Sequence, residues 1–114
     1  MSGGLSIEAA FQENLPITVV IDNNGGLDCI SQQQERLFAS GKHFATDFRD
    51  IPFHSMFEGL GGHGELVERR EDLGPALQRA MSSGKPACVN VKCRGVISPI
   101  VAATSDKREK ASIE

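Results

Sequence analysis

The chain has 114 residues, a length that fits one domain and is short for two. A formal net charge of −3 argues against nucleic acid as a partner, and no apolar run approaches the length of a membrane span, so we expect neither a nucleic-acid nor a membrane partner. The N-terminus has no basic region followed by an apolar one, so we predict no secretory signal. The three cysteines lack Cys-x-x-Cys spacing and are typical of reduced thiols in a cytoplasmic protein.

The first two predicted elements are a helix and a strand. Residues 5–13 are predicted to be a short helix, because Ile7, Ala10 and Phe11 fall at helical spacing. Pro16 is incompatible with a continued helix and leads into residues 17–21, which are all β-branched. This run has no polar alternation, so we predict a central strand of a parallel sheet, covered on both faces. A βαβ unit would place another strand before the helix. Without it, the strand at 17–21 keeps a free edge that favours pairing with another chain.

A polar and flexible cluster, Asp22–Gly26, follows this strand directly. Ligands of open α/β sheets bind beyond the carboxyl ends of strands. The amide oxygen of an Asn side chain and a free backbone carbonyl are suitable ligands for a hard cation such as Mg²⁺. The alternative is that Asn-Asn-Gly-Gly is only a turn, since these residues dominate turns for conformational reasons.

Two segments of opposite character come next. Residues 27–40 are predicted to form a helix with one side made by Ile30, Gln34, Leu37 and Phe38, and with Gln32, Gln33, Glu35 and Arg36 largely in solvent. Residues 41–50 are polar and are predicted to be a loop. His43 in this loop is interpreted as a surface residue rather than a catalytic one.

The remaining elements alternate between helix and strand. We expect Asp50 to be the N-cap of a helix, with Pro52 in its first turn and Gly61 at its end. Residues 65–68 are a short strand candidate, residues 73–81 a second helix ended by Gly84, and residues 86–92 a further strand. The helix after Asp50 has an apolar stripe of Phe53, Met56, Phe57 and Leu60. The helix at 73–81 has an apolar stripe of Leu73, Ala76, Leu77, Ala80 and Met81.

Two kinds of candidate site residue are not assigned a function. His54 and His63 are too far apart in the sequence to form a helical i, i+4 pair of metal ligands. Cys88 is interpreted as a buried hydrophobic residue.

The predicted order is therefore helix, strand, helix, helix, strand, helix, strand. Strands that alternate with helices imply parallel pairing, so the fold class is α/β, a partial parallel three-layer α/β/α sheet. We assign residues 1–103 to this domain and residues 104–114, which are charged and lack an apolar stripe, to a flexible tail.

A family resemblance adds to this interpretation. Asn14-Leu-Pro-Ile, a Val-rich strand and Asn23-Asn24-Gly25-Gly26 resemble the second half of the thiamine-diphosphate-binding motif. The similarity is to the acetolactate synthase-like group of thiamine-diphosphate-dependent enzymes, in their C-terminal, Rossmann-like cofactor-binding domain. Later stretches are similar to the end of that domain and bring the resemblance to roughly residues 4–101. These stretches are Phe57–Val67, Glu71-Asp72-Leu73 and Gly84–Ala87, followed by a Val strand.

The resemblance implies a cofactor site at the cluster. Asn23, Asn24, Gly25 and Gly26 would bind thiamine diphosphate, with the Asn24 side chain and the Gly26 carbonyl as ligands of Mg²⁺. The role of Asp22 stays open. The family motif opens with Gly-Asp-Gly, which this sequence lacks, so it resembles a family member that begins inside the motif. No residue matches the family's activating glutamate, and we assign no catalytic residue.

Three functions follow as hypotheses. The first is the thiamine-diphosphate- and magnesium-binding portion of a carbon–carbon lyase, synthase or transferase acting on 2-keto acids or aldehydes. Such a chain would be inactive alone, and would form a homo-oligomer or associate with the missing domains. The second is a non-catalytic α/β scaffold or interaction module derived from that family. The third, a Rossmann-like nucleotide binder, is disfavoured because there is no Gly-x-Gly-x-x-Gly or Walker-type loop.

Overall fold

The computed structural model describes residues 4–99, which divide into two compact units. The sheet unit contains residues 4–23 and 51–93, and the helix–loop unit contains residues 24–50 and 94–99. The predicted tail, 104–114, lies outside the described residues, so the predicted domain boundary stays a prediction. Within residues 4–99, no helix is long and apolar enough to cross a membrane.

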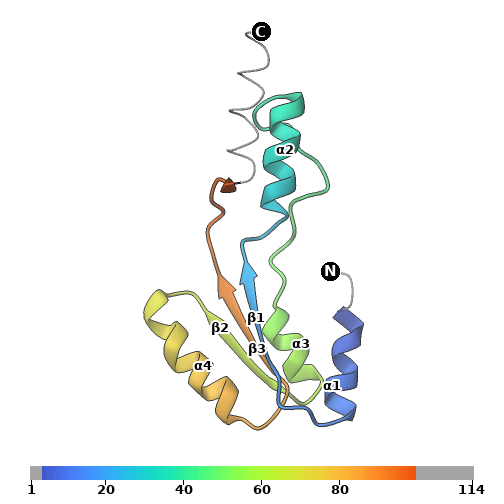
Figure 1. Cartoon of the computed structure of the whole chain (residues 1–114), viewed down its shortest axis with the longest axis vertical. Coiled ribbons are helices and arrows are strands. Elements are labelled where there is room, and N and C mark those ends of the chain that lie inside the picture. The colour runs from blue at the N-terminus through green and yellow to red at the C-terminus, as the bar shows by residue number, and fades with distance from the viewer. Residues whose placement is uncertain (1–3, 100–114) are drawn as a thin grey trace. The chain divides into compact units, whose positions relative to one another are not determined.

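The sheet unit holds all three strands (Figure 1). A 3-10 helix η1, Gly4–Ile7, runs into helix α1, Glu8–Gln12, before strand β1, Thr18–Asn23. After the helix–loop unit the chain returns with α3, Phe53–Gly59, and β2, His63–Val67. It ends with the 3-10 helix η2, Arg70–Asp72, then α4, Leu73–Ser82, and β3, Ala87–Lys92. With α2, Asp28–Phe38, in the other unit, the predicted order of elements and the α/β class are confirmed.

The sheet is parallel throughout, with strand order β1-β3-β2. β3 is the central strand, and Ala87, Cys88, Val89 and Asn90 are all 0% exposed. The prediction that the run at 17–21 forms a central strand covered on both faces was wrong. β1 pairs with β3 alone among the described strands, and Val20 is 52% exposed. An uninterrupted apolar run indicates burial, but the strand's place in the order depends on which other strands are present.

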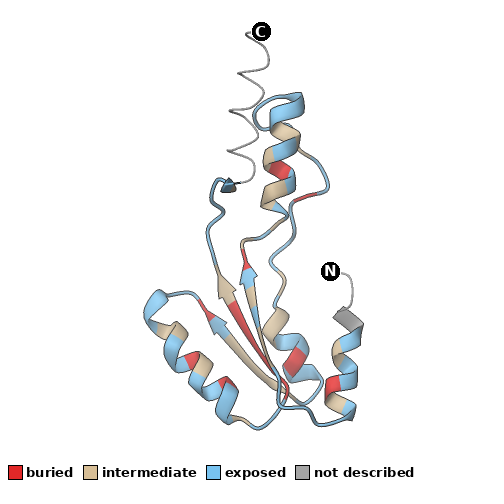
Figure 2. Ribbon diagram, viewed as in Figure 1, coloured by how far each residue is buried: buried red, intermediate tan, exposed pale blue. Residues whose placement is uncertain are grey.

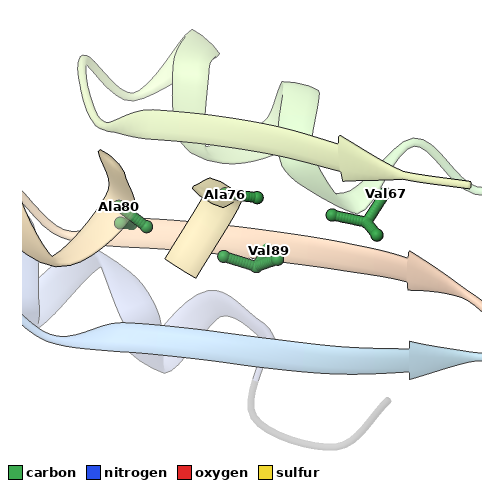
Figure 3. Packing of buried hydrophobic residues seen from close by; sticks show 5 residues of the cluster. Val67, Ala76, Ala80 and Val89 are labelled. Carbon is green, nitrogen blue, oxygen red and sulfur yellow. The ribbon is translucent and has the colours of Figure 1, made fainter. Parts of the chain in front are cut away.

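Helices cover the two faces of this sheet. Residues of β3 alternate between the faces, so that Val89 packs with Ala76 and Ala80 of α4 (Figure 3). Val67 of β2 completes the same cluster. On the opposite face, the Asn90 side chain lies 3.3 Å from Nδ1 of His54 in α3. The small alanines allow α4 to approach the sheet closely, and buried residues concentrate along β3 and the inner side of α4 (Figure 2).

Helix α3 follows its predicted stripe in part. Phe57 is buried and its ring meets that of Phe11 in α1 edge to face, with centroids 5.7 Å apart. Met56 and Leu60 of the same stripe are more than 40% exposed. The predicted N-cap was wrong, because α3 begins at Phe53 and the residue in the cap position is Pro52 rather than Asp50. Its end is as predicted, since the chain turns at Gly61 with φ of +87°, where glycine carries no steric penalty.

Helix α2 matches its predicted span but not its predicted face. Leu37 and Phe38 are 61% and 66% exposed, and the buried residue of the helix is Ser31. Gln32, expected in solvent, is half-buried because its side chain bonds the backbone of residues 96 and 98. Its Nε2 donates to the Val96 carbonyl at 2.8 Å, and its Oε1 accepts from the Ser98 N–H at 2.9 Å. The face of α2 is therefore set by polar contacts with the chain rather than by an apolar stripe.

Candidate functional site at the Asn24–Gly26 turn

The chain leaves β1 through a tight turn at Asn24–Gly26. The Asn24 side-chain Oδ1 accepts a hydrogen bond from the Gly26 N–H at 3.3 Å, which makes this an Asx turn. Gly25 has φ of +79°, a conformation that an L side chain adopts only with strain. The sequence therefore forms the turn through the short amide side chain at one position and the missing Cβ at the next.

A second segment fixes the backbone of this turn. Gly26 forms an isolated antiparallel bridge with Asp47. Its two bonds run from the Leu27 N–H to the Thr46 carbonyl and from the Phe48 N–H to the Gly25 carbonyl, each 2.8 Å long. In this pattern the N–H and C=O of Gly26 itself point away from residues 46–48. The Gly26 carbonyl and the Asn24 Oδ1, which binds the Gly26 N–H, therefore lie on the same side of the turn.

The approach of the two segments leaves no room for a side chain at Gly26. A Cβ built there would lie 2.7 Å from the Thr46 carbonyl oxygen, closer than real Cβ atoms come to a backbone atom. Glycine is thus required at this position by the neighbouring backbone, and at Gly25 by its own φ angle.

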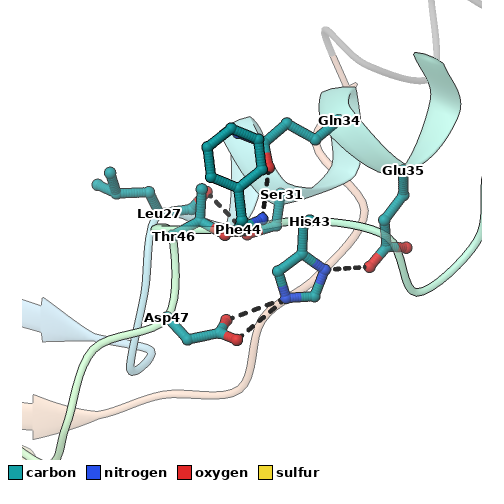
Figure 4. Close-up of polar contacts among 8 residues, drawn as sticks. All are labelled: Leu27, Ser31, Gln34, Glu35, His43, Phe44, Thr46 and Asp47. Carbon is teal, nitrogen blue, oxygen red and sulfur yellow. Dashed lines mark hydrogen bonds and ion pairs between the residues drawn. The ribbon is translucent and has the colours of Figure 1, made fainter. Parts of the chain in front are cut away.

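Polar side chains join residues 43–47 to α2, as Figure 4 shows. The Ser31 hydroxyl donates to Oγ1 of Thr46 at 2.7 Å, and the Phe44 N–H donates to the Gln34 side chain at 2.8 Å. His43 lies between two carboxylates, 2.7 Å from Glu35 and 3.1 Å from Asp47. Hydrogen bonds to Asp47 and then Glu35 raise the pKa of His43 above its ordinary 6.5. Sequence reasoning correctly predicted the loop but missed this network, because its three contacts with α2 join residues 8 to 15 positions apart.

Asn23, the other predicted amide, belongs to the sheet unit. Its side chain is 9% exposed and donates to the Asn90 Oδ1 at 3.1 Å and to the Ile51 carbonyl at 3.4 Å. Its own carbonyl accepts from the Cys93 N–H at 3.0 Å, extending the β1–β3 ladder by one bond. The Asn23 side chain therefore anchors the end of β1 to the central strand.

The cysteines of the sheet unit differ in environment. Cys88 is fully buried, as predicted, and burial raises the pKa of its thiol to about 11. Cys93 is exposed, and its hydrogen bond with Asp22 raises the pKa of its thiol above the ordinary value. A thiol with a raised pKa is a poor nucleophile at neutral pH, so neither residue adds reactive chemistry.

The turn at Asn24–Gly26 offers only neutral oxygen atoms as metal ligands. The Asn24 Oδ1 and the Gly26 carbonyl are neutral oxygens, which suit a hard cation such as Mg²⁺. Within residues 4–99, no group of three or more His, Cys, Asp or Glu side chains could hold a metal ion. The residues present thus fit a cation whose negative ligands come from elsewhere, such as a bound diphosphate, and do not form a complete cage for Mg²⁺.

Comparison with known proteins identifies the family. Residues 1–91 match the family model described as thiamine pyrophosphate enzyme, C-terminal TPP binding domain. The chain belongs to this family. The resemblance to thiamine-diphosphate-dependent enzymes is confirmed, and the three-stranded parallel sheet with flanking helices is consistent with part of such a domain.

Individual relatives show how much of a thiamine-pyrophosphate enzyme this chain spans. It is 36% identical over 89 residues to a probable acetolactate synthase of Mycobacterium bovis, covering 77% of this chain and 16% of that protein. It is 31% identical over 103 residues to an oxalyl-CoA decarboxylase of Escherichia coli K12, covering 90% and 17%. A 2-hydroxyacyl-CoA lyase of Arabidopsis thaliana is 28% identical over 107 residues, covering 90% and 18%. The chain therefore spans less than a fifth of the length of the relatives it matches.

Proposed function

We propose that this chain binds the diphosphate end of thiamine diphosphate through Mg²⁺, with the Asn24 side-chain oxygen and the Gly26 carbonyl as metal ligands. The observation that carries the proposal is their placement on one side of a turn whose other side is held by residues 46–48. Gly25 and Gly26 keep side chains away from this backbone, so that a phosphate group can approach it. Asn23 holds the strand end from which the turn departs.

The charge at the turn limits what the chain does alone. Two neutral oxygens do not balance the charge of a divalent cation, so the negative ligands would come from the diphosphate and from a carboxylate such as that of the Gly-Asp-Gly half of the motif, which this sequence lacks. Asp47 forms the backbone bridge with Gly26, but its carboxylate already pairs with the His43 ring at 3.1 Å. We therefore propose that the carboxylate is supplied from outside residues 4–99, and that the chain is inactive without the segments that carry it.

In the proposed function, the cofactor would carry out the chemistry and the protein would bind and orient it. When bound, the cofactor supplies a nucleophilic carbon that adds to the carbonyl of a 2-keto acid or aldehyde, as lyases, synthases and transferases of this kind require. The part of this chain is to bind and orient the diphosphate. The relatives' printed names, a synthase, a lyase and a decarboxylase, support this class without selecting a substrate. We further propose a homo-oligomeric or multidomain assembly, and a cytoplasmic location in which the three cysteines stay reduced.

The test is isothermal titration of the purified chain with thiamine diphosphate, in the presence of Mg²⁺ or of EDTA. Asn24→Ala should remove the Mg²⁺-dependent binding, whereas Asn24→Asp retains an acceptor for the Gly26 N–H and should bind at least as tightly as the wild type. Gln33→Ala, which removes an exposed amide from α2, is the matched control and should bind as the wild type does. Unchanged affinity in Asn24→Ala would exclude this side chain as a ligand.

A second function, a non-catalytic α/β scaffold or interaction module, is favoured by the lack of any carboxylate among the proposed ligands. It predicts a folded chain that shows no heat of binding in either titration. Adding a separate polypeptide that carries the Gly-Asp-Gly half of the motif distinguishes the two functions. Restored Mg²⁺-dependent binding supports the cofactor function, and continued absence of binding supports the scaffold.

A further inference from the structure

Two buried hydroxyls lie beside the proposed ligand turn. Within the described part of the helix–loop unit, the buried side chains are Ser31 and Thr46, at 7% and 2% exposed. Their hydroxyl oxygens are 2.7 Å apart, and Ser31 Oγ also lies 3.3 Å from the carbonyl of Leu27, the residue just before α2. A buried hydroxyl without a hydrogen-bond partner lowers the stability of the fold. The bond between Ser31 and Thr46 therefore makes a specific connection between α2 and the loop at residues 41–50.

Thr46 connects in turn to the glycine that carries a proposed ligand. Its carbonyl accepts from the Leu27 N–H at 2.8 Å, and it is the atom that a Cβ on Gly26 would strike. Fixing the side chain of Thr46 on α2 therefore fixes the backbone that lies against Gly26. The same bonded segment directs the Gly26 carbonyl to the side on which the Asn24 oxygen lies.

We propose that Thr46 is a positioning residue for the Gly26 carbonyl, acting through its hydroxyl contact with Ser31 and its backbone contact with Leu27. Its effect on the backbone of the turn is independent of any ligand. Its effect on binding rests on the proposed function, because it requires that the Gly26 carbonyl is a metal ligand. The occupant of that site is the Mg²⁺ complex of a diphosphate.

The experiment compares Thr46→Val, which keeps the shape of the side chain and removes the hydroxyl, with Thr46→Ser, which restores it. Ser83→Ala is the matched control. It removes a hydroxyl that makes a 2.7 Å bond to the Ala80 carbonyl in the sheet unit. Hydrogen exchange of the Leu27 and Phe48 amides reports the backbone bonds of the turn. Titration with thiamine diphosphate, with and without Mg²⁺, reports ligand binding.

Thr46→Val should increase exchange of both amides about tenfold, because Ser31 loses its 2.7 Å partner and keeps only the 3.3 Å contact with the Leu27 carbonyl. It should weaken Mg²⁺-dependent binding by a similar factor, with no change in exchange of the Val89 amide in the sheet unit. Thr46→Ser should recover most of both effects, and Ser83→Ala should show neither.

The outcomes separate the two proposals. Unchanged exchange of Leu27 and Phe48 in Thr46→Val would overturn the positioning role, whether or not the chain binds cofactor. Increased exchange with no binding by the wild type, even after the polypeptide with the Gly-Asp-Gly half of the motif is added, would support the positioning of the backbone and contradict the cofactor function. Increased exchange with unchanged Mg²⁺-dependent affinity would overturn the claim that the position of the Gly26 carbonyl matters to the metal.

Discussion

The two units of the chain are stabilised in opposite ways. In the sheet unit, the buried cluster consists of apolar side chains, each at most 2% exposed, and these are Val67, Ala76, Ala80, Ala87 and Val89. In the described part of the helix–loop unit, the buried side chains are two hydroxyls, and the large apolar residues lie in solvent. Leu37, Phe38 and Phe44 are 61%, 66% and 71% exposed.

This difference predicts how the two units contribute to the stability of the chain. Burial of apolar surface is the dominant favourable term in folding, so the sheet unit should unfold only globally. The helix–loop unit depends on hydrogen bonds, each of which contributes about 1 kcal/mol net. It should open locally at lower free energy, as segments that close on ligands commonly do. Its exposed apolar side chains are also candidates for contact with another protein surface.

The largest expected effect tests the core of the sheet unit. Val89→Ala should lower the free energy of unfolding by about 2–3 kcal/mol, because it removes buried methyl groups and leaves a cavity beneath α4. Leu37→Ala in α2 removes a larger side chain but one in solvent, and should cost less than about 0.5 kcal/mol. Urea unfolding of the two variants measures the contrast. Equal losses would mean that the helix–loop unit has an apolar core of its own.

A smaller effect comes from an ion pair that joins α4 to β2. The Nε and Nη2 atoms of Arg79 each donate to one carboxylate oxygen of Glu65 at 2.8 Å, and His63 lies 2.8 Å from the same carboxylate. Arg79, and to a lesser extent His63, lower the pKa of Glu65 from 4.5 to about 2. Because the folded-state pKa is lowered, the pair stabilises the protein above pH 4.5, and the stabilisation is lost as the pH falls toward 2.

Glu65→Gln should therefore be less stable than the wild type at pH 7, with a difference that shrinks toward pH 2. We expect about 1–2 kcal/mol at pH 7, less than the full pKa shift implies, because the Arg79 side chain is more than half exposed and solvent screens the pair. Thermal unfolding across this pH range measures the difference. A gap between the two proteins that stays constant with pH would show that the loss comes from packing rather than from the charge.

His43 gives the corresponding pH effect in the helix–loop unit. Its pKa is raised by Asp47 and Glu35, so the protonated ring stabilises the loop fully below pH 6.5, and this is lost as the pH rises through the folded-state pKa. The three side chains are solvent-accessible, so the effect should be local. The protection factor of the Phe44 amide, which is its exchange rate relative to that of an unstructured amide at the same pH, should fall above that pH, and the protection factor of the Val89 amide should not change.

Proton NMR titration of the His43 ring measures its pKa directly. Glu35→Gln should lower that pKa toward 6.5, and Glu13→Gln, which removes an exposed carboxylate of the sheet unit, is the control for net charge. A wild-type pKa at or below 6.5 would contradict the contacts with Asp47 and Glu35.

The elements themselves could be predicted from sequence because each has a local cause. The β-branched run before Asn23, the helical spacing in residues 73–81 and the glycines at 61 and 84 act over a few neighbouring residues. Asn24 and Gly26 were found through a family motif, and their turn has local causes too, an Asx bond and a positive φ at Gly25. Their role as ligands stays a prediction.

What could not be predicted depends on residues distant in sequence. The place of β1 at the edge is decided by β3, whose partner residues lie 69 positions away at Thr18–Ala87. The face of α2 is decided by Thr46 and by residues 96–98, which bond to polar side chains. A pattern of apolar residues predicts a helix face only where apolar burial orients the helix, and α2 is oriented by hydrogen bonds.

The smallest expected effect on stability tests the exposed apolar side chains of the helix–loop unit. Phe44→Ser should change the free energy of unfolding by less than about 0.5 kcal/mol, since the ring is 71% exposed while the backbone N–H that bonds Gln34 is retained. It should instead weaken self-association, measured by light scattering over a range of protein concentrations, because exposed aromatic rings favour contact between molecules. Phe57→Ser, which places a hydroxyl in the buried contact with Phe11, is the contrasting control and should unfold the sheet unit. A large loss of stability in Phe44→Ser would show that this ring is covered in solution, and the contrast between the two units would then have to be abandoned.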